Sequence, residues 1–528
     1  MKETMQHKIW KSCRQTMLLR VTITLLLSLG GPVVAYSSDS LGLLDAVRLT
    51  LAKNPDIQLQ EKQVEINQGV LQQATGQFDL TLRLTAGHAV DHNPLNQQSR
   101  DYYASQGFPV SQLKTETTSY HLALEKPLRN GMVLSPSVGT TSANGTSNDI
   151  NSLSSQNRGS VDFSVLVPLK KGSGESAASG ETAANLEWEA SKQDLRHAIS
   201  QEITNTLTAY WNLLAARKNL DIARETEASI RRMVDNVRLV IEADELPAAD
   251  LNMVRANLLD KTASRISAEQ TLLNARKGLG QAIGLSYPQI TRLEPNDEFP
   301  AISTDFSALE SQLPRLINLA LKRRADLAAA QRRQDSARIL ASAYQNDLKP
   351  RFDLSVSVGY AGLSEGGSTL GGIGKNRGDP NVGLNLSYQW PFDNNVARGR
   401  YLQQSASYDQ NTLRVATLER TIGIGVSSAL SDLTLSALRL RESEETVNLY
   451  RISVENEKVR LKLGTATMVE LLTVNDRLLN AELGHISYWL NYFNSLARLN
   501  FEAGTLLAEE KPEQSIRLNQ LVSLPKLE

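Results

Sequence analysis

The sequence repeats one pattern twice, and this repeat limits the possible folds more than any other feature. The stretch LTLAKNPDIQLQ begins at residue 49, and LALKRRADLAAA, 270 positions later, keeps its apolar spacing and matches Asp326 to Asp56. Pro168 then matches Pro391 at an offset of 223, and Gly284 matches Gly504 at an offset of 220. Three blocks in the same order predict two similar halves, each with short helices, strands, a very long helix, a break and a long helix.

Each half contains a long segment that is nearly free of proline and has apolar residues at helical spacing. The segments run from about 180 to 242 and from about 394 to 463, with seam residues such as Ile199, Ile203, Ile422 and Val426. A helix of about 65 residues is about 100 Å long, far beyond a compact domain. A second helix of nearly 40 residues follows each, and Gly284 and Gly504 are the predicted helix ends.

The two helix breaks near the start of the halves differ in sequence. Asn54 and Pro55 break the first, with proline suited to a first helical turn. Arg324 and Ala325 take their places in the second. We therefore expect packing alone to hold the second break.

Segments with alternating apolar and polar residues predict β-strands. They lie near 80–86, 163–167, 352–358 and 384–388. A soluble β-sandwich explains these strands by themselves, but the two very long helices do not fit a sandwich. A membrane β-barrel has the same alternation.

The strand region of the first half is 47 residues longer, which is the difference between the offsets 270 and 223. Alternation around 120–124 and 133–138 predicts an additional strand pair, and the alternative is an elaborated loop. Two or three strand pairs cannot close a barrel, because about eight strands are needed. An open edge in lipid leaves backbone groups unpaired, so several chains must share one barrel.

The N-terminus has the pattern of an export signal. Basic residues precede an apolar run from Val21 to Leu29, and Val33 and Ala35 suit cleavage after residue 35. A run of about ten residues is too short to span a bilayer, which argues against the alternative of an uncleaved anchor. Cys13 precedes this run, so a lipoprotein is not expected. Beyond residue 35 no run approaches 18 apolar residues, so no transmembrane helix is expected.

The charge argues weakly against nucleic acid as a partner. The whole chain has a net charge of −1, and residues 1–35 contain five Lys or Arg and one Glu, so removing them leaves −5. The remaining chain contains no cysteine and needs no disulfide framework.

Three stretches carry a resemblance to a known family: DAVRLTLAKNPDIQ, TAYWNLLAARKNL, and KVRLKLGTATMVELLTVNDRLLNAE with a terminal AG. From about residue 41 to 506 the chain resembles the TolC family of outer-membrane efflux proteins. The resemblance implies an α+β membrane protein and a homotrimer, with one shared transmembrane β-barrel in the bacterial outer membrane and a coiled-coil α-helical barrel in the periplasm. It implies a passive exit duct without cofactors for a tripartite efflux pump or type I secretion system, with a periplasmic adaptor (membrane fusion) protein and an inner-membrane pump of RND or ABC type.

This interpretation divides the chain into five parts. They are a signal peptide (1–35), a first repeat (41–284), a connecting segment (285–309), a second repeat (310–504) and a tail (505–528). The strands are expected at about 79–168 and 350–391, and the long helices at about 180–284 and 394–504.

The resemblance also implies a gate at the break between the two helices of each half, where acidic side chains ring a constriction. Glu470 lies where the family has an acid, Asp250 is its partner in the first half, and Thr473 stands where the family has a second acid. Gly464 is the turn glycine, and Asp244 replaces it in the first half, three residues before Pro247. Ala466 replaces a family arginine. The alternative is that these charges are simply solvated on long helices.

Other chemistry is sparse. His88 and His92 lack neighbouring metal ligands, and 363–378 lacks a phosphate-binding motif because Asn376 follows Lys375. We expect that segment to be a mobile loop and the protein not to be an enzyme. The rival function is a non-conducting trimeric coiled-coil surface protein, which should show one continuous repeat rather than two internal copies. Drugs, metals and proteins cannot be distinguished as cargo.

Overall fold

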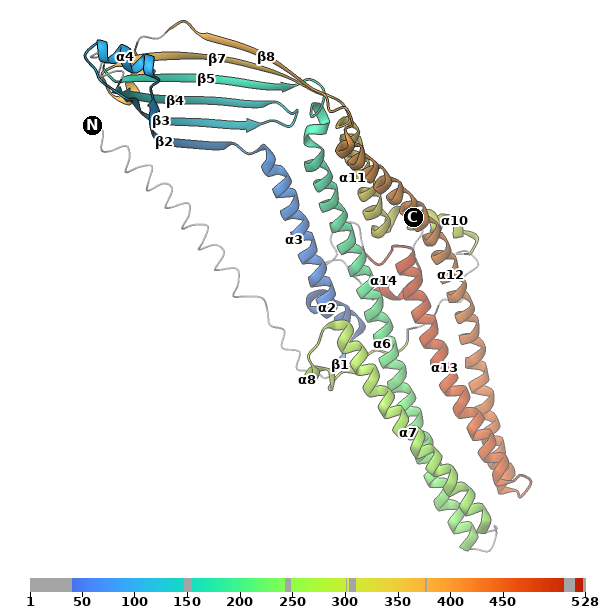
Figure 1. Ribbon diagram of the computed structural model, residues 1–528. Coiled ribbons are helices and arrows are strands. Elements are labelled where there is room, and N and C mark those ends of the chain that lie inside the picture. The colour runs from blue at the N-terminus through green and yellow to red at the C-terminus, as the bar shows by residue number, and fades with distance from the viewer. Residues whose placement is uncertain are drawn as a thin grey trace, which may run out of the picture.

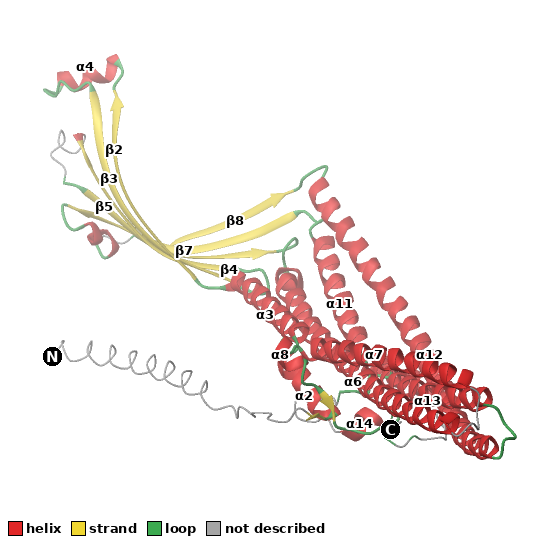
Figure 2. Ribbon diagram, turned by 90° about the horizontal axis from the view of Figure 1, so that it is seen from below, coloured by secondary structure: helices red, strands yellow, loops and turns green. Residues whose placement is uncertain are grey.

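The protein is elongated, with a β-sheet at one end and long helices that extend to the other (Figures 1 and 2). The computed structural model describes residues 40–146, 154–242, 248–300, 302, 310–375, 378–507 and 518–525. The expected signal peptide therefore lies outside the described residues.

The first half begins with β1 (Ser40–Leu41), α2 (Leu43–Lys53) and α3 (Pro55–Thr75). Asn54 separates the helices, and its Oδ1 accepts hydrogen bonds from the backbone N–H groups of Asp56 (2.8 Å) and Ile57 (3.1 Å). Pro55 is the first residue of α3, a position where the backbone N–H that proline lacks would make no helical hydrogen bond. The predicted break is confirmed.

The strands of the first half come next. They are β2 (Thr81–Pro94), β3 (Gln112–Pro127), β4 (Val133–Gly145) and β5 (Gln156–Pro168). The short helix η1 (Gly76–Phe78) precedes β2 in the chain, and the short helix α4 (Gln97–Ser105) follows it. The segment longer by 47 residues thus contains a strand pair rather than only a loop. After η2 (Gly174–Ala178) come α6 (Ser179–Glu242), α7 (Ala248–Ile283), α8 (Tyr287–Ile290) and β6 (Glu294–Pro295).

The second half has a similar order of elements. It contains α10 (Leu313–Arg323), α11 (Ala325–Asn346), β7 (Arg351–Glu365), η3 (Thr369–Ile373), β8 (Asn381–Gln389), α12 (Asn395–Lys462), α13 (Met468–Glu502) and α14 (Leu518–Val522). The helices α6 and α12 have 64 and 68 residues, which corresponds to about 100 Å each.

The predicted helix-ending glycines follow α7 and α13. Gly284 and Gly504 have φ angles of +83° and +68°, a conformation that glycine adopts without strain. A Cβ on Gly284 would lie 2.7 Å from the carbonyl oxygen of Lys53, and one on Gly504 would lie 3.2 Å from the carbonyl carbon of Arg323. In both halves the end of a long helix therefore packs against the break between two shorter helices.

The second break is held by charge as well as by packing, so the prediction of packing alone is wrong. The Arg324 guanidinium donates to Asp326 (Nη2 to Oδ2, 2.7 Å) and to Glu502 at the end of α13. Burial opposes ionisation of Asp326, but the hydrogen bond and charge of Arg324 outweigh it and lower the pKa of this carboxyl.

The six longer strands form one antiparallel sheet in the order β2-β3-β4-β5-β7-β8. The pairing of β5 with β7 joins the two halves of the chain. A separate two-stranded parallel sheet pairs β1 with β6 beside the helices.

The two faces of the large sheet differ in polarity. Residues paired across strands share a face, and one row is apolar on five strands: Leu84, Leu122, Val138, Val161 and Tyr360. A row on the opposite face is small or polar on all six: Arg83, Ala123, Ser137, Asp162, Gly359 and Asn381. The apolar side chains are largely exposed; Leu84 is 70% exposed and Leu384 is 74% exposed.

The glycine-rich segment 363–378 connects β7 to β8 as expected, but its described part is held against the sheet. Asn157 Nδ2 donates to the carbonyl of Gly367 (3.3 Å), and Gly366 N–H donates to the carbonyl of Ser155 (3.0 Å). A Cβ on Gly372 would lie 2.4 Å from the carbonyl oxygen of Asn157. Close approach to β5, rather than mobility alone, explains the glycines.

The main core lies between the helices. The predicted seam residues are buried there: Ile199, Ile203, Leu207, Tyr210, Leu214, Ile422, Val426, Leu430, Leu433, Ala437 and Leu440. Trp211 stacks on Phe493 with ring centroids 4.5 Å apart. Among the described residues, α12 alone is long and apolar enough to cross a membrane, but a core helix passes the same test and α12 buries part of its surface in this core.

Candidate functional site at the turns of the helix pairs

The C-terminal end of α6, the start of α7 and the turn between α12 and α13 lie at the end of the molecule farthest from the sheet (Figure 1). Residues 243–247, including the candidates Asp244 and Pro247, lie outside the described residues. The start of α7 and the whole turn between α12 and α13 are described, so the other four candidates have a defined place: Asp250, Gly464, Glu470 and Thr473.

Gly464 ends α12 in the conformation that the sequence suggests. Its φ is +70°, and the hydrogen bonds from Gly464 N–H to Leu461 O (3.0 Å) and from Thr465 N–H to Arg460 O (2.9 Å) close the last helical turn. This is a glycine-dependent helix end, because other residues rarely adopt a positive φ.

Glu470 belongs to a capping box at the start of α13. Its Oε2 accepts from the backbone N–H of Thr467 (2.7 Å) and from its hydroxyl (3.1 Å), while Thr467 Oγ1 accepts from the N–H of Glu470 (3.3 Å). We did not predict this role, although the spacing Thr-x-x-Glu is its known signature. Glu470 therefore has a structural function besides its charge.

The charge of Glu470 is stabilised where it lies. The hydrogen bonds from the backbone and side chain of Thr467, together with the nearby Arg460 guanidinium, lower the pKa of the exposed Glu470 carboxyl. Arg460 also contacts Glu457 (Nη1 to Oε2, 2.9 Å) and the carbonyl of Thr465 (3.3 Å). Sequence reasoning noted the missing arginine at Ala466 but overlooked this cation from the last turn of α12.

The first turns of α13 have one buried and one exposed face. Met468, Leu471 and Leu472 are buried in a small core with residues of α6 and α7: Ile230, Val237 and Val254. Glu470 and Thr473 lie on the opposite, exposed face. The Thr473 hydroxyl donates to the carbonyl of Val469 (2.8 Å), within its own helix.

Asp250 is the third residue of α7, as Glu470 is the third residue of α13. This matching position agrees with the offset of 220, and it also suits an acid because negative charge is favourable at a helix N-terminus. Asp250 is half-buried, whereas Glu470 is exposed. Thus, within one chain, Glu470 and Thr473 share a helix face, and Asp250 lies on a different helix.

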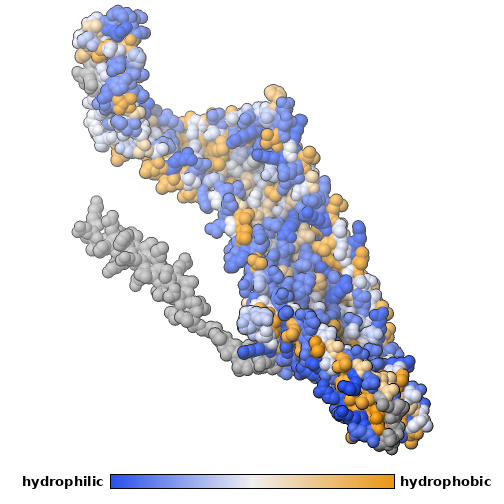
Figure 3. Space-filling view, turned by 60° about the horizontal axis from the view of Figure 1, so that its bottom comes forward, coloured by the Kyte–Doolittle hydropathy of each residue, from blue (hydrophilic) through white to orange (hydrophobic). Residues whose placement is uncertain are grey.

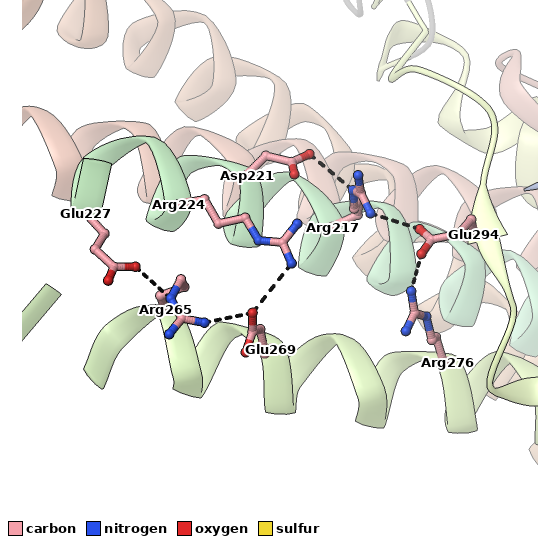
Figure 4. Close-up of polar contacts among 8 residues, drawn as sticks. All are labelled: Arg217, Asp221, Arg224, Glu227, Arg265, Glu269, Arg276 and Glu294. Atoms are coloured by element: carbon pink, nitrogen blue, oxygen red, sulfur yellow. Dashed lines mark hydrogen bonds and ion pairs between the residues drawn. The ribbon is translucent and has the colours of Figure 1, made fainter. Parts of the chain in front are cut away.

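Farther from the turns, charged side chains connect α6, α7 and β6 (Figure 4). Glu227 of α6 contacts Arg265 of α7 (2.6 Å), and Arg224 contacts Glu269 (3.5 Å). Glu294 contacts both Arg217 (3.2 Å) and Arg276. A further ion pair, Lys261 with Asp476 (2.6 Å), joins α7 to α13.

Apolar side chains are exposed at the end of the molecule that carries the turns (Figure 3). They come from the last turns of α6 and α12, the residue that follows α12, and the first turn of α13: Leu239, Val459, Leu463 and Val469. Leu463 is 71% exposed. Contiguous exposed apolar surface of this kind marks contact surfaces for proteins or membranes.

The described residues contain no group of three or more His, Cys, Asp or Glu side chains arranged to hold a metal ion. His88 Nδ1 is hydrogen-bonded to Thr118 Oγ1 (2.9 Å) on β3.

Comparison with known proteins places this architecture among outer-membrane channels. Residues 316–505 match the family described as "Outer membrane efflux protein". The chain is 26% identical to outer membrane protein TolC of Escherichia coli (strain K12) over 342 residues, which are 63% of this chain and 67% of that one. Its identity to outer membrane protein TolC of Vibrio cholerae is 23% over 330 residues, which are 61% of this chain and 73% of that one.

Solved structures have the same fold at low sequence identity. The outer-membrane channel OprN has a TM-score of 0.63 at 17% identity, covering 88% of this chain and 89% of that chain. The CmeC outer membrane channel of Campylobacter jejuni has a TM-score of 0.62 at 16% identity, covering 88% of this chain and 85% of that chain. These similarities, with the doubled arrangement of strands and long helices, support a TolC-family outer-membrane factor.

Proposed function

We propose that three copies of this chain form one outer-membrane exit duct, whose helices extend into the periplasm and whose entrance is controlled at the turns of the helix pairs. The observation that carries the proposal is the two-faced sheet: one face has apolar rows and the other has polar rows. A wall between lipid and water needs this pattern.

The open sheet supports assembly from several copies. Six strands are fewer than the roughly eight that close the smallest barrels, and the outer edges of β2 and β8 have no partner strand among the described residues. Unpaired backbone groups are too costly to expose to lipid. Copies of the chain that pair at these edges satisfy the backbone and extend the apolar face around the barrel.

The turns suit an entrance that is controlled by charge. With three copies around one axis, three Glu470 carboxylates, and Asp250 of α7 with them, form a ring that attracts cations. The Thr467 cap fixes the Glu470 carboxylate, and its hydrogen bonds lower the pKa of this carboxyl, which favours the charged form at neutral pH. Neutral Thr473 shares this face and leaves each copy with one exposed acid there.

The exposed apolar residues at the turns supply a surface for a periplasmic adaptor. An apolar surface next to charged side chains suits a protein partner. We propose that the adaptor and an inner-membrane pump complete a tripartite efflux or type I secretion system, in which the pump selects the cargo.

Reconstitution tests the channel itself. The purified protein in planar lipid bilayers should give discrete conductance steps. The rival function, a non-conducting trimeric surface protein, gives a trimer without steps. A monomer, or a trimer that never conducts, contradicts the proposal.

Two substitutions at one position test the gate. Glu470→Gln retains the capping-box hydrogen bonds, since glutamine serves in the same motif, and removes the charge. We expect both Glu470→Gln and Glu470→Ala to weaken block by multivalent cations or to raise conductance, because the ring of charge is lost. In addition, Glu470→Ala should weaken the helix cap by about 1 kcal/mol.

Glu482→Gln is the matched control, because Glu482 is also on α13 but pairs with Arg451 (2.9 Å) away from the turn. Its cation block should equal that of the wild type. Since the pKa of Glu470 is lowered, its charge is present above the ordinary glutamate pKa of about 4.3, and block should persist as the pH is lowered to that value. Unchanged block in Glu470→Gln removes this residue from the gate.

A further inference from the structure

The strand pair β3–β4 is an insertion in an otherwise matching arrangement. In the first half β2 follows the short helices and β5 precedes α6; in the second half β7 and β8 hold the same places. The second half passes from β7 to β8 through the short helix η3, whereas the first half places β3 and β4 between β2 and β5. The sheet is two strands wider as a result.

The inserted strands have the same two faces as their neighbours. On the apolar face, Leu122 of β3 pairs with Leu84, and Val138 of β4 pairs with Val161. On the polar face, Ala123 pairs with Arg83 and Ser137 with Asp162. An elaborated loop outside the membrane has no need to continue an apolar row, so the pattern indicates strands at the depth of the lipid.

The turn of the insertion is fixed to the junction between sheet and helices. Arg129, between β3 and β4, forms two hydrogen bonds to Glu181 in the first turn of α6, each 2.6 Å long. Gly174 N–H donates to Asn130 O (3.1 Å), and a Cβ on Gly131 would lie 2.2 Å from the carbonyl oxygen of Gly172. These contacts hold the inserted pair at the same level as β2 and β5.

We propose that β3 and β4 are part of the barrel wall, so that each copy supplies six strands and three copies form an eighteen-stranded barrel. The seams join β2 of one copy to β8 of the next. Because six is even and neighbouring strands alternate in direction, β2 and β8 run antiparallel and each seam continues the pairing of the sheet. This inference relies on the proposed trimeric channel.

The wider wall has a consequence for what passes through it. Barrel diameter increases roughly linearly with strand number, so the barrel is about half as wide again as one built from four strands per copy. Barrels of 16 to 18 strands leave an open aqueous channel. The inserted pair therefore suits an exit for bulkier cargo than four strands per copy would allow.

Cysteine labelling in membranes tests whether the inserted strands lie in the wall. The test uses a Cys13→Ser background, which leaves the chain without cysteine. In this background, cysteines introduced as Leu122→Cys and Val138→Cys should not be labelled by a membrane-impermeant maleimide. Ala123→Cys and Ser137→Cys, on the polar face of the same strands, should be labelled through the lumen. The matched pair Val358→Cys and Ser357→Cys on β7 shows the same contrast for a strand that is not inserted.

The outcomes separate this inference from the proposed function. If the β7 pair shows the contrast but all four positions on β3 and β4 are labelled equally, the insertion lies outside the wall and the inference is wrong. If the β7 pair shows no contrast either, the result contradicts the proposed channel itself, on which the inference relies.

Cross-linking tests the seams directly. In the same background, Thr85→Cys on β2 is combined in turn with Gly383→Cys, Asn385→Cys or Ser387→Cys on β8, all on the polar face. Oxidation of at least one combination should link chains into dimers and trimers that reducing agent separates. Cross-links found only within a single chain would contradict the proposed pairing of β2 with β8 of the next copy. Electron cryomicroscopy of the trimer should then show eighteen strands, and twelve would overturn the inference.

Discussion

The pairs α6–α7 and α12–α13 have nearly the same lengths but differ in the chemistry that joins their helices. The lengths are 64 and 36 residues in the first pair and 68 and 35 in the second. In α6–α7 the Glu227 carboxylate is buried and accepts from Thr262 (3.0 Å) and Arg265 (2.6 Å). These hydrogen bonds, from Thr262 and then Arg265, lower the pKa of Glu227.

The α12–α13 pair uses neutral groups at its centre. Ser443 Oγ is hydrogen-bonded to His485 Nδ1 (2.8 Å), and Trp489 Nε1 donates to His485 Nε2 (3.1 Å). The indole N–H can donate only to an unprotonated ring nitrogen. Burial lowers the pKa of His485, Arg451 also lowers it, and Glu444 opposes the shift.

The two breaks near the start of the halves differ in the same way. Asn54 caps a helix with a neutral side chain, whereas Arg324 binds two carboxylates. Apolar spacing therefore determines the shared path of the chain, and different polar groups stabilise it in the two halves.

The largest expected effect comes from removing the cation at the second break. Arg324→Ala leaves the Asp326 and Glu502 carboxylates close together without their partner, and their side chains are only 18% and 17% exposed. Loss of one partner of a buried ion pair costs about 3–5 kcal/mol, and we expect the lower end of this range because the site is partly exposed. Thermal unfolding in detergent measures the loss.

Asn54→Ala is the matched variant at the first break. It removes a neutral helix cap, which by itself is worth about 0.5–2 kcal/mol, together with the hydrogen bonds that Asn54 Nδ2 donates to Glu202 (3.0 Å) and to the carbonyl of Ala282 (2.8 Å). If Asn54→Ala loses as much stability as Arg324→Ala, the proposed difference between the charged and the neutral break is wrong.

A smaller effect is expected from neutralising Glu227. Glu227→Gln removes the charge that Arg265 and Arg231 share (2.6 Å and 3.0 Å), and hydrogen exchange should increase in α6 and α7 but not in α12 and α13. Glu482→Gln, in the more exposed pair with Arg451, should cost only about 0.2–1 kcal/mol. Greater protection loss in Glu482→Gln than in Glu227→Gln refutes the ranking.

The smallest effect is a pH response confined to one pair. Because the folded-state pKa of His485 is lowered, its contribution to stability is complete above the ordinary histidine pKa of about 6.5 and is lost as the pH falls through the folded-state value. The carboxyl of Glu227 has a lowered pKa, so its contribution is lost only below about pH 4. Hydrogen exchange between pH 7 and 5, corrected for intrinsic rates, should increase in α12–α13 alone. His485→Asn should abolish the difference, and an equal response of both pairs contradicts it.

Local patterns predicted the elements that depend on neighbouring residues. Apolar residues at helical spacing gave the long helices, Gly464 gave a turn, and alternation around Leu122 gave an added strand. The bond from Arg324 to Glu502 joins residues far apart in sequence, so local spacing contains no sign of it. The packing of η3 against β5 also joins segments far apart in sequence, so local spacing did not predict it. The cap formed by Thr467 follows a local sequence signature, but Glu470 was interpreted only as a gate charge.

The pairing of β5 with β7 also affects the order in which the protein assembles. β5 ends at Pro168 and β7 begins at Arg351, so β5 has no neighbour on that side until the whole first helix pair has been synthesised. Contacts between distant segments form slowly, and exposed strand edges promote aggregation meanwhile. A nascent chain of this design therefore leaves the β5 edge unpaired until the second half arrives.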